Sequence, residues 1–333
     1  MADSGSLDIL GIGNAIVDVL AHTDDAALEA ESLVKGTMAL IDAPEADRLY
    51  RNLGPAIEVS GGSCANTIAG AASLGSTTAY IGRVRDDDLG RIFTHDIRAT
   101  GVHFSTEPAT DGPGTARCLV MVTPDAQRTM CTYLGASVGL SPSDIDAPLV
   151  RAADITYLEG YLWDPPEAKE AFRAAIAIAK DAGRRVALTL SDPFCVERHR
   201  DEFRELVDHG IDILFANQDE ITALYETDDL NRALAAVRGR CPIVVVTRSE
   251  KGSVVLTADE HHEVSAAPVD RVVDTTGAGD LYAAGFLHGL TSGRSLPECA
   301  AIGGLAAAEV ISHMGARPET DLARLVVDAQ VAR

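Results

Sequence analysis

Two patterns of apolar and polar positions divide the chain. From about residue 154 onward, short apolar runs alternate with longer segments in which apolar residues recur at helical spacing. This alternation predicts strand–helix units, which build a parallel sheet covered by helices on both faces. The expected strands are 155–158, 185–190, 211–216 and 243–247, and the expected helices include 167–182 and 198–207.

The first half of the chain adds strand signals of another kind. An apolar run at 7–13 predicts a buried central strand that ends in a turn. Short alternating segments without an intervening long helix then occur in two clusters: 16–20 with 37–41, and 118–122 with 129–133. We therefore expect a small β-sheet lid, formed by insertions at about 16–45 and 102–135, on a single domain of residues 1–333.

Composition and charge exclude some classes of function. The net charge of -22 argues against a nucleic-acid partner, because phosphate backbones are gripped by lysine and arginine clusters that this chain lacks. An anionic ligand would have to be bound locally, by helix N-termini, Mg²⁺ and a few cations. The six cysteines have no metal-type spacing. No apolar run approaches the length of a membrane helix and the N-terminus has no signal pattern, so we expect a cytoplasmic protein.

The segment from Asp274 to Asp280, Asp-Thr-Thr-Gly-Ala-Gly-Asp, carries the strongest chemical signal. It opens a helix expected at 281–290, so a glycine-rich turn would present free backbone N–H groups at the positive end of the helix dipole. Such a point binds phosphate. A carboxylate there repels the ligand unless it takes a proton from an attacking hydroxyl, the role we assign to Asp280. By itself, a Gly-Ala-Gly-Asp turn is as often structural as functional.

The whole seven-residue segment resembles the C-terminal signature of the ribokinase-like, or PfkB, small-molecule kinases. The resemblance implies that Asp280 is the catalytic base and that Gly277, Ala278 and Gly279 form the anion hole. It extends over nearly the whole chain through motifs in the family's order: Gly13-Asn14-x-x-x-Asp18, Gly61-Gly62-x-x-x-Asn66, Asn217-x-x-Glu220, Thr247-x-x-x-x-Gly252 and the segment itself. The implied fold is a ribokinase-like three-layer α/β/α sandwich with a mainly parallel central sheet and a β-sheet lid.

The N-terminal motifs resemble the adenosine-kinase-like branch of that family. The resemblance implies that the substrate's hydroxyl groups are held by Asn14, Asp18, Gly61, Gly62, Ser63 and Asn66. Taken alone, Asp18 could be an ordinary turn carboxylate, and the Gly-Gly pair could serve only to pack the apolar helix expected at 67–74.

The C-terminal motifs imply an ATP site with Mg²⁺. Asn217 and Glu220 have the spacing of a helix capping box, and in the family they act on Mg²⁺-bound phosphates; both interpretations can hold together. The resemblance adds Thr247, Ser249 and Gly252 at the nucleotide, although the family usually has glycine where Ser249 stands. His313, near the end of an Ala-rich helix that starts at Ser295, is either an adenine contact or a solvated helix-terminal histidine. Asp274 would bind a monovalent cation, with K⁺ as activator.

These observations favour an ATP-dependent kinase that phosphorylates the CH₂OH group of a ribonucleoside, with adenosine as the leading substrate. The alternatives are a ribokinase- or fructokinase-type sugar kinase, another nucleoside kinase, or a binding protein that has lost catalysis. An oxidoreductase using Gly11 and Gly13 lacks the third glycine of the dinucleotide fingerprint. We expect a small-molecule substrate and a monomer or homodimer. Candidates for the base pocket are Phe104, Tyr133, Leu134 and Trp163.

Overall fold

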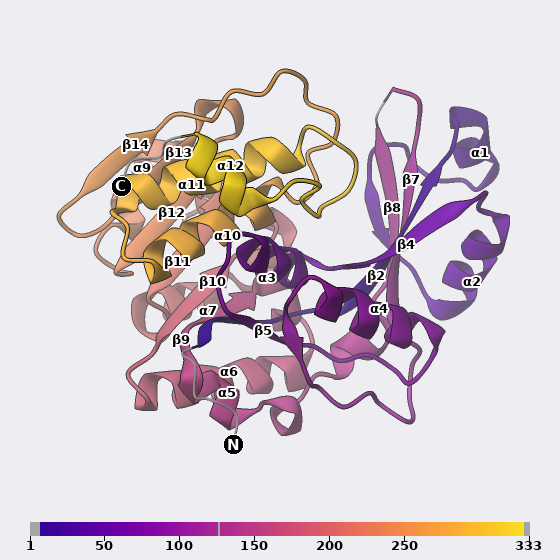
Figure 1. The fold of residues 1–333 in the computed structure, drawn as a ribbon, viewed down its shortest axis with the longest axis horizontal. Coiled ribbons are helices and arrows are strands. Elements are labelled where there is room, and N and C mark those ends of the chain that lie inside the picture. Colours follow the sequence, from indigo (N-terminus) through magenta and orange to yellow (C-terminus); the bar gives the residue numbers. More distant parts are fainter. Residues whose placement is uncertain (1–6, 126, 330–333) are drawn as a thin grey trace.

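A nine-stranded sheet organises the larger part of the molecule in the computed structural model, which describes residues 7–125 and 127–329 (Figure 1). Strands β12 to β6 of this sheet run parallel, and β13 and β14 are added antiparallel at one edge. Their order is β14 (His261–Val264), β13 (Ser253–Leu256), β12 (Ile243–Thr247), β11 (Ile213–Asn217), β10 (Arg185–Thr189), β9 (Ala153–Glu159), β1 (Leu7–Ile12), β5 (Thr78–Ile81) and β6 (His103–Phe104).

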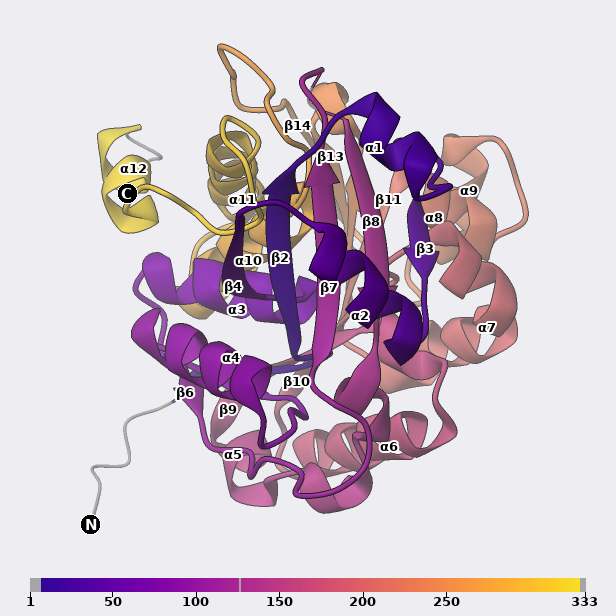
Figure 2. The same cartoon turned by 90° about the vertical axis from the view of Figure 1, so that its right-hand side faces the viewer.

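A second sheet of five strands stands at one side of the large sheet, and we call it the lid sheet (Figures 1 and 2). Its order is β3 (Met38–Leu40), β8 (Arg128–Tyr133), β7 (Ala116–Val122), β2 (Ile16–His22) and β4 (Ala56–Gly61). Helices α1 (Asp25–Ala30) and α2 (Ala43–Asn52) lie beside it (Figure 2). The expected mainly parallel α/β architecture with a small β-sheet is confirmed.

The two segments that form the lid sheet have boundaries that differ from the expected insertions, one at its end and the other at its start. The first segment reaches Gly61, because β4 pairs antiparallel with β2. The second begins later than expected, because β6 pairs with β5 in the large sheet. Phe104 of β6 is buried against Tyr80 and Phe93, with ring centroids 6.0 and 5.5 Å away, so its assignment to the base pocket was wrong.

Helices cover both faces of the large sheet. One face carries α3 (Ser63–Ser73), α10 (Ala278–Thr291) and α11 (Leu296–Val310), with α4 (Asp88–Ala99) and α12 (Leu322–Asp328) at its margin. The other face carries α5 (Ala147–Ala152), α6 (Pro166–Asp181), α7 (Pro193–Glu205), α8 (Gln218–Leu224) and α9 (Leu230–Val237). Short helical turns complete the chain at Gly135–Gly139, Pro142–Asp144, Gly160–Trp163, Leu206–Gly210 and Ser249–Lys251.

The central strands are apolar on both sides, as expected of a parallel sheet between two helical layers. In β12, Val245 packs into the core under α10 and α11, whereas Val244 and Val246 pack into the core on the opposite face. This alternation is the period-two geometry of a strand. In the part of the chain that the structure describes, no helix is both long and apolar enough to cross a membrane.

Helix starts follow the capping chemistry of the sequence. Asp192 accepts a hydrogen bond from the Cys195 amide and Pro193 follows it, so α7 begins five residues before the expected start at 198. The expected capping boxes at Asn217 and Ser295 are both confirmed. Asp and Pro together were therefore a start signal that periodicity alone did not reveal.

Helices α10 and α11 approach each other through glycine. A methyl group added at Gly303 would lie 2.6 Å from the Tyr282 carbonyl oxygen, and one at Gly285 would lie 2.7 Å from the Gly303 backbone. These obstacles are backbone atoms, which cannot rotate away. Gly304, the next residue of α11, has its nearest such atom at 3.8 Å, an ordinary contact distance. The chain thus offers a matched pair of helical glycines.

We expect Gly303→Ala to lower the free energy of unfolding by about 1–3 kcal/mol, because a methyl group there forces two packed helices apart. Gly304→Ala should be neutral or should stabilise by up to about 1 kcal/mol, since alanine favours a helix over glycine. Urea unfolding of both variants and the wild type measures the difference. Equal stability of the two variants would contradict the requirement for glycine at the helix contact.

Candidate active site

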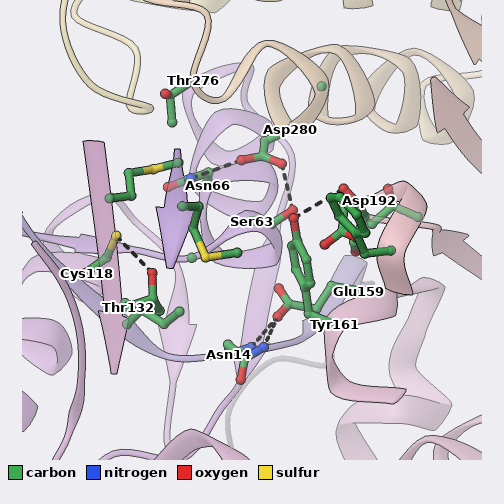
Figure 3. Close-up of a pocket in the computed structure, with 18 of the residues that line it drawn as sticks. Asn14, Ser63, Asn66, Cys118, Thr132, Glu159, Tyr161, Asp192, Thr276 and Asp280 are labelled. Carbon is green, nitrogen blue, oxygen red and sulfur yellow. Dashed lines mark hydrogen bonds between the residues drawn. The ribbon is translucent and has the colours of Figure 1, made fainter. Parts of the chain in front are cut away.

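A cavity of about 580 Å³ lies between the lid sheet and the carboxyl ends of the large-sheet strands (Figure 3). This edge is where open α/β sheets bind their ligands. The cavity brings together ten of the residues expected at the site: Asn14, Asp18, Gly62, Ser63, Asn66, Asn217, Glu220, Thr247, Gly279 and Asp280. The remaining expected residues are not among those that line it: Gly61, Ser249, Gly252, Asp274, Gly277, Ala278 and His313.

Asp280 lies in the first turn of α10 and faces the start of α3 (Figure 3). Its carboxylate accepts hydrogen bonds from the Ser63 hydroxyl at 2.7 Å and from Asn66 Nδ2 at 3.0 Å. Burial raises the pKa of Asp280, while these two hydrogen bonds oppose the rise. A partly buried carboxylate of raised pKa that already accepts a hydroxyl hydrogen bond is suited to take a proton from an alcohol.

The start of α10 has the form of an anion site. Its N-cap residue, Gly277, has φ 75°, and no side chain of the described residues caps the helix. A methyl group at Gly277 would lie 2.8 Å from the Ala316 side chain, whereas one at Gly279 would meet no described atom within 4 Å beyond its chain neighbours and the nearby backbone of its own helix. Gly277 is therefore required by the turn, and Gly279 leaves open space beside an uncapped helix start. Free amides of such a start can bind phosphate oxygens.

Asp18, on β2, brings a carboxylate from the lid sheet into the cavity. A methyl group at Gly61 would lie 2.2 Å from Asp18 Oδ2, so the glycine makes room for this side chain. Burial raises the pKa of Asp18 to about 7, Arg317 opposes the rise, and Asp280 adds to it. Within residues 7–125 and 127–329, no donor forms a hydrogen bond with this carboxylate. It is thus an acceptor available to a ligand.

Glu159, at the end of β9, is a cavity residue that sequence reasoning missed. Its Oε1 accepts from the Asn14 amide at 2.9 Å and from Asn14 Nδ2 at 2.5 Å (Figure 3). Its Oε2 accepts from the Cys64 amide at 2.8 Å. Burial raises its pKa to about 7, against these hydrogen bonds. The available signal was a glutamate at the carboxyl end of an apolar strand, where charge has no packing role.

Arg317 was also missed. It is partly buried and donates to the Ser60 carbonyl at 3.0 Å, the Ala65 carbonyl at 2.6 Å and the Ser60 hydroxyl at 2.9 Å. Its positive charge opposes the rise in pKa of both Asp18 and Asp280. The guanidinium therefore joins the C-terminal loop to β4 and α3 and offsets part of the negative charge of the cavity.

Asn217 and Glu220 form a reciprocal capping box at the start of α8, and Glu220 also lines the cavity. Burial raises the pKa of Glu220 to about 7, with the nearby Asp192 as a further cause. Carboxylate and amide oxygens suit Mg²⁺, which keeps much of its shell for water and phosphate. Among the described residues no three Asp, Glu, His or Cys side chains converge into a metal site. The role of Asn217 and Glu220 at Mg²⁺ stays a prediction.

Asp274 is held by an ion pair with Arg128 of the lid strand β8, at 2.9 Å between Oδ1 and Nε. It also accepts from the Thr276 amide at 2.8 Å and the Gly315 amide at 3.0 Å. The Asp274 carboxylate thus fixes the loop before α10 to the loop after α11. Its assignment to a monovalent cation stays a prediction, with a guanidinium now known to lie beside it.

The other expected nucleotide residues have distinct positions. Ser249 has φ 52°, a left-handed conformation that explains why glycine is usual at this point. A methyl group at Gly252 would collide with the Val264 carbonyl, so this glycine lets β13 and β14 approach. His313 lies beside Glu309, with 3.3 Å between Nε2 and Oε2. Contacts of these three residues with ATP stay predictions.

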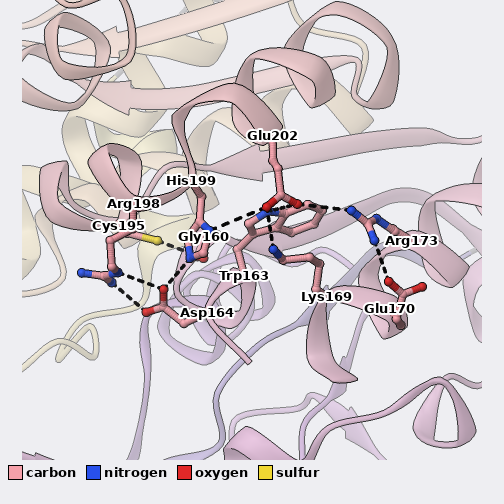
Figure 4. Close-up of polar contacts among 10 residues, drawn as sticks. All are labelled: Gly160, Trp163, Asp164, Lys169, Glu170, Arg173, Cys195, Arg198, His199 and Glu202. Atoms are coloured by element: carbon pink, nitrogen blue, oxygen red, sulfur yellow. Dashed lines mark hydrogen bonds and ion pairs between the residues drawn. The ribbon is translucent and has the colours of Figure 1, made fainter. Parts of the chain in front are cut away.

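The residues expected to form the base pocket do not all line the cavity. Leu134 lines the cavity, but Tyr133 does not. Trp163 packs between Phe172 and Phe203. Its Nε1 donates to Glu202 (Figure 4), so its assignment to the pocket was wrong. An aromatic residue just after a strand did not reveal whether it faces the cavity or the core.

Three exposed apolar side chains line the cavity instead. They are Met38 and Leu40 of β3, which are 46% and 62% exposed, and Phe194 of α7, which is 72% exposed. Large apolar surfaces left open in a cavity indicate contact with an apolar part of a ligand.

An uncapped helix start, a carboxylate beside it and a facing small sheet are the features expected of a small-molecule kinase. Residues 46–322 match the model of the pfkB family carbohydrate kinases, and the chain belongs to this family, whose members are ATP-dependent kinases that use Mg²⁺. The fold is therefore the ribokinase-like α/β fold.

Solved structures and curated relatives of several specificities resemble the chain. An adenosine kinase from Sinorhizobium meliloti is 55% identical, with a TM-score of 0.92 over 98% of this chain and 100% of that one. A probable sugar kinase from Rhizobium etli CFN 42 is 50% identical, with a TM-score of 0.93 over 98% and 99%. The Saccharomyces cerevisiae adenosine kinase is 27% identical over 91% of this chain and 94% of its own length.

Proposed function

We propose that this kinase transfers a phosphoryl group from ATP to the 5′-hydroxyl of a ribonucleoside, with adenosine as the preferred substrate. The observation that carries the proposal is the composition of the cavity. It combines hydrogen-bond acceptors for hydroxyl groups with the open apolar surface of Met38, Leu40 and Phe194. A nucleobase would cover that surface, whereas a free sugar would leave it wet. The 55% identity to an adenosine kinase structure supports the same substrate.

The acceptors match a ribose. The Asp18 carboxylate has no described donor, and the buried Oδ1 atoms of Asn14 and Asn66 have no partner among the described residues. Unpaired buried acceptors are costly, so a ligand that donates hydroxyl hydrogens would gain affinity by pairing them. The 2′- and 3′-hydroxyls of a ribose are donors of this kind.

The reaction then follows from the chain's own groups. Asp280 would accept the proton of the 5′-hydroxyl, taking a hydrogen-bond position now used by the Ser63 hydroxyl. The amides at the start of α10 would stabilise negative charge on the transferring phosphoryl group. Glu220 and Asn217 would help to hold Mg²⁺, which supplies charge neutralisation on the phosphates when bound. A sugar kinase with the same groups is the alternative, supported by the 50% identity to a probable sugar kinase.

With ATP and Mg²⁺, we expect adenosine to be phosphorylated with a higher kcat/KM than inosine, guanosine, cytidine, ribose or fructose. A coupled assay of ADP formation over this panel measures the ratios. Efficient turnover of ribose or fructose with no nucleoside turnover would overturn the nucleoside proposal and leave a sugar kinase.

The Phe194→Ala variant tests whether the base of the nucleoside contacts the Phe194 ring. If a base covers this ring, its removal should raise the KM for the nucleoside by about 5–30-fold, the worth of roughly 1–2 kcal/mol of aromatic contact. Val327→Ala, which truncates a side chain 73% exposed outside the cavity lining, is the control and should leave KM unchanged.

Asp280→Asn should lower kcat by roughly 10²–10⁴, because an amide cannot accept the hydroxyl proton. Steady-state kinetics and calorimetric binding of ATP measure catalysis and binding separately. Asp270→Asn removes the same charge at an exposed position of the preceding loop and should keep wild-type activity. A variant at Asp280 that changed KM alone would contradict its role as base.

Potassium should raise the activity if Asp274 contributes to a monovalent cation site. Arg128 already neutralises this carboxylate, so the response to K⁺ should be larger in Arg128→Gln than in the wild type. Rates in potassium chloride and in tetramethylammonium chloride at equal ionic strength give the activation ratio for each protein. Equal rates in the two salts for both proteins would exclude the cation site.

A further inference from the structure

Two asparagine side chains in the cavity are oriented by carboxylates. Asn14 donates a hydrogen bond from its Nδ2 to Glu159, and Asn66 donates one from its Nδ2 to Asp280 (Figure 3). Both oxygens of each carboxylate accept hydrogen bonds, and the nitrogen end of each amide faces the carboxylate. The oxygen end of each amide is then left over. Both residues are nearly wholly buried, at 3% and 4% exposure, and neither Oδ1 atom has a partner in the described part of the chain.

The two orienting carboxylates differ in function. Asp280 belongs to the reaction proposed above, whereas Glu159 has no place in it. Within the described ranges, every hydrogen bond of Glu159 comes from the loop after β1 or from the start of α3: the Asn14 amide, Asn14 Nδ2 and the Cys64 amide. A buried carboxylate is an expensive way to hold two backbone amides, which a carbonyl could also satisfy. The carboxylate has two acceptor oxygens, so one group holds both backbone amides and also fixes the orientation of the Asn14 side chain.

We propose that Glu159 is a specificity-determining positioning residue, which holds the Asn14 side chain with Oδ1 free to accept a hydrogen bond from the substrate. Asn14 then selects substrates that donate at this point. The donor is a hydroxyl or an exocyclic amino group, and a carbonyl or a hydrogen atom at the same place is rejected. This inference rests on the proposed function only for the identity of the substrate.

The substitution Glu159→Gln would change this arrangement. The new amide has one acceptor oxygen for two backbone amides, so its Nε2 must face either Cys64 or Asn14. When Nε2 faces Asn14, the asparagine can turn its Oδ1 toward it and present Nδ2 to the ligand. Glu159→Gln should therefore weaken the preference for a donor at one position of the substrate. The preference for donors at the substrate positions that contact Asp18 and Asn66 should not change.

The experiment compares adenosine with three analogues that each lack one donor: 2′-deoxyadenosine, 3′-deoxyadenosine and purine riboside, which has a hydrogen atom in place of the amino group. One of the three analogues lacks the donor that faces Asn14 Oδ1. We expect the wild type to phosphorylate this analogue with a kcat/KM about 5–150-fold lower than that for adenosine. Glu159→Gln should reduce that one ratio to within about threefold of unity and leave the other two ratios unchanged. Ratios between substrates cancel any effect of residue 159 on Asp280, because that effect is common to all of them.

Asn14→Ala provides the second variant, since it keeps both backbone amides that Glu159 accepts from. It should abolish the same ratio, and in its background Glu159→Gln should produce no further change in any ratio. Thermal unfolding of each variant checks folding. The proposal is overturned if Asn14→Ala leaves all ratios at wild-type values, or if Glu159→Gln changes the three ratios equally or not at all.

Failure of the proposed function gives a different result. If the wild type phosphorylates a sugar and no nucleoside, the nucleoside proposal fails while the Glu159 proposal is tested on that sugar and its singly deoxygenated analogues. A single deoxy position whose penalty disappears in both variants would support the positioning role. Penalties that are unaffected by either variant would overturn it.

Discussion

Carboxylate charge inside one cavity is the constraint on which the rest of this structure depends. Asp18, Glu159 and Asp280 share the cavity, and burial raises the pKa of each. A carboxylate out of water is costly unless donors or cations face it. Glu159 has three N–H donors and Asp280 has two side-chain donors, so both are largely satisfied by the protein. Among the described residues Asp18 has mainly the field of Arg317, and a hydroxyl-bearing substrate would satisfy it best.

The architecture provides those donors by bringing distant segments together. Helices α3 and α10 begin at the same edge of the sheet, so Ser63 and Asn66 reach Asp280 across more than two hundred residues of sequence. Close approach of the elements relies on glycine where a side chain would collide, as at Gly61 beside Asp18 and at Gly303 beside Tyr282. Packing and chemistry are therefore coupled, because the helices that carry the site are held by contacts that tolerate no extra methyl group.

The sequence predicted the parts of this molecule that depend on local patterns. Alternating strands and helices indicated the sheet, and the segment from Asp274 to Asp280 indicated the helix start with its carboxylate. Glu159 and Arg317 escaped prediction because their roles depend on partners 145 and 257 positions away, Asn14 and Ser60. Phe104 and Trp163 were misplaced for a related reason. An aromatic side chain in or after a strand is equally compatible with the core and with a pocket, and only the fold decides which side it faces.

The two ends of the cavity differ in electrostatic character. On the side of Asn14 and Asp18, acceptors without described donors favour a neutral ligand rich in hydroxyl groups and repel phosphate. At the start of α10, an uncapped helix and open space beside Gly279 favour an anion, although the chain as a whole has a net charge of -22. Asp280 lies at the boundary, in the first turn of that helix and in contact with Asn66. A neutral alcohol and a nucleoside triphosphate would thus each be favoured at one end, and the hydroxyl group and the terminal phosphate would meet beside the carboxylate that can take the proton.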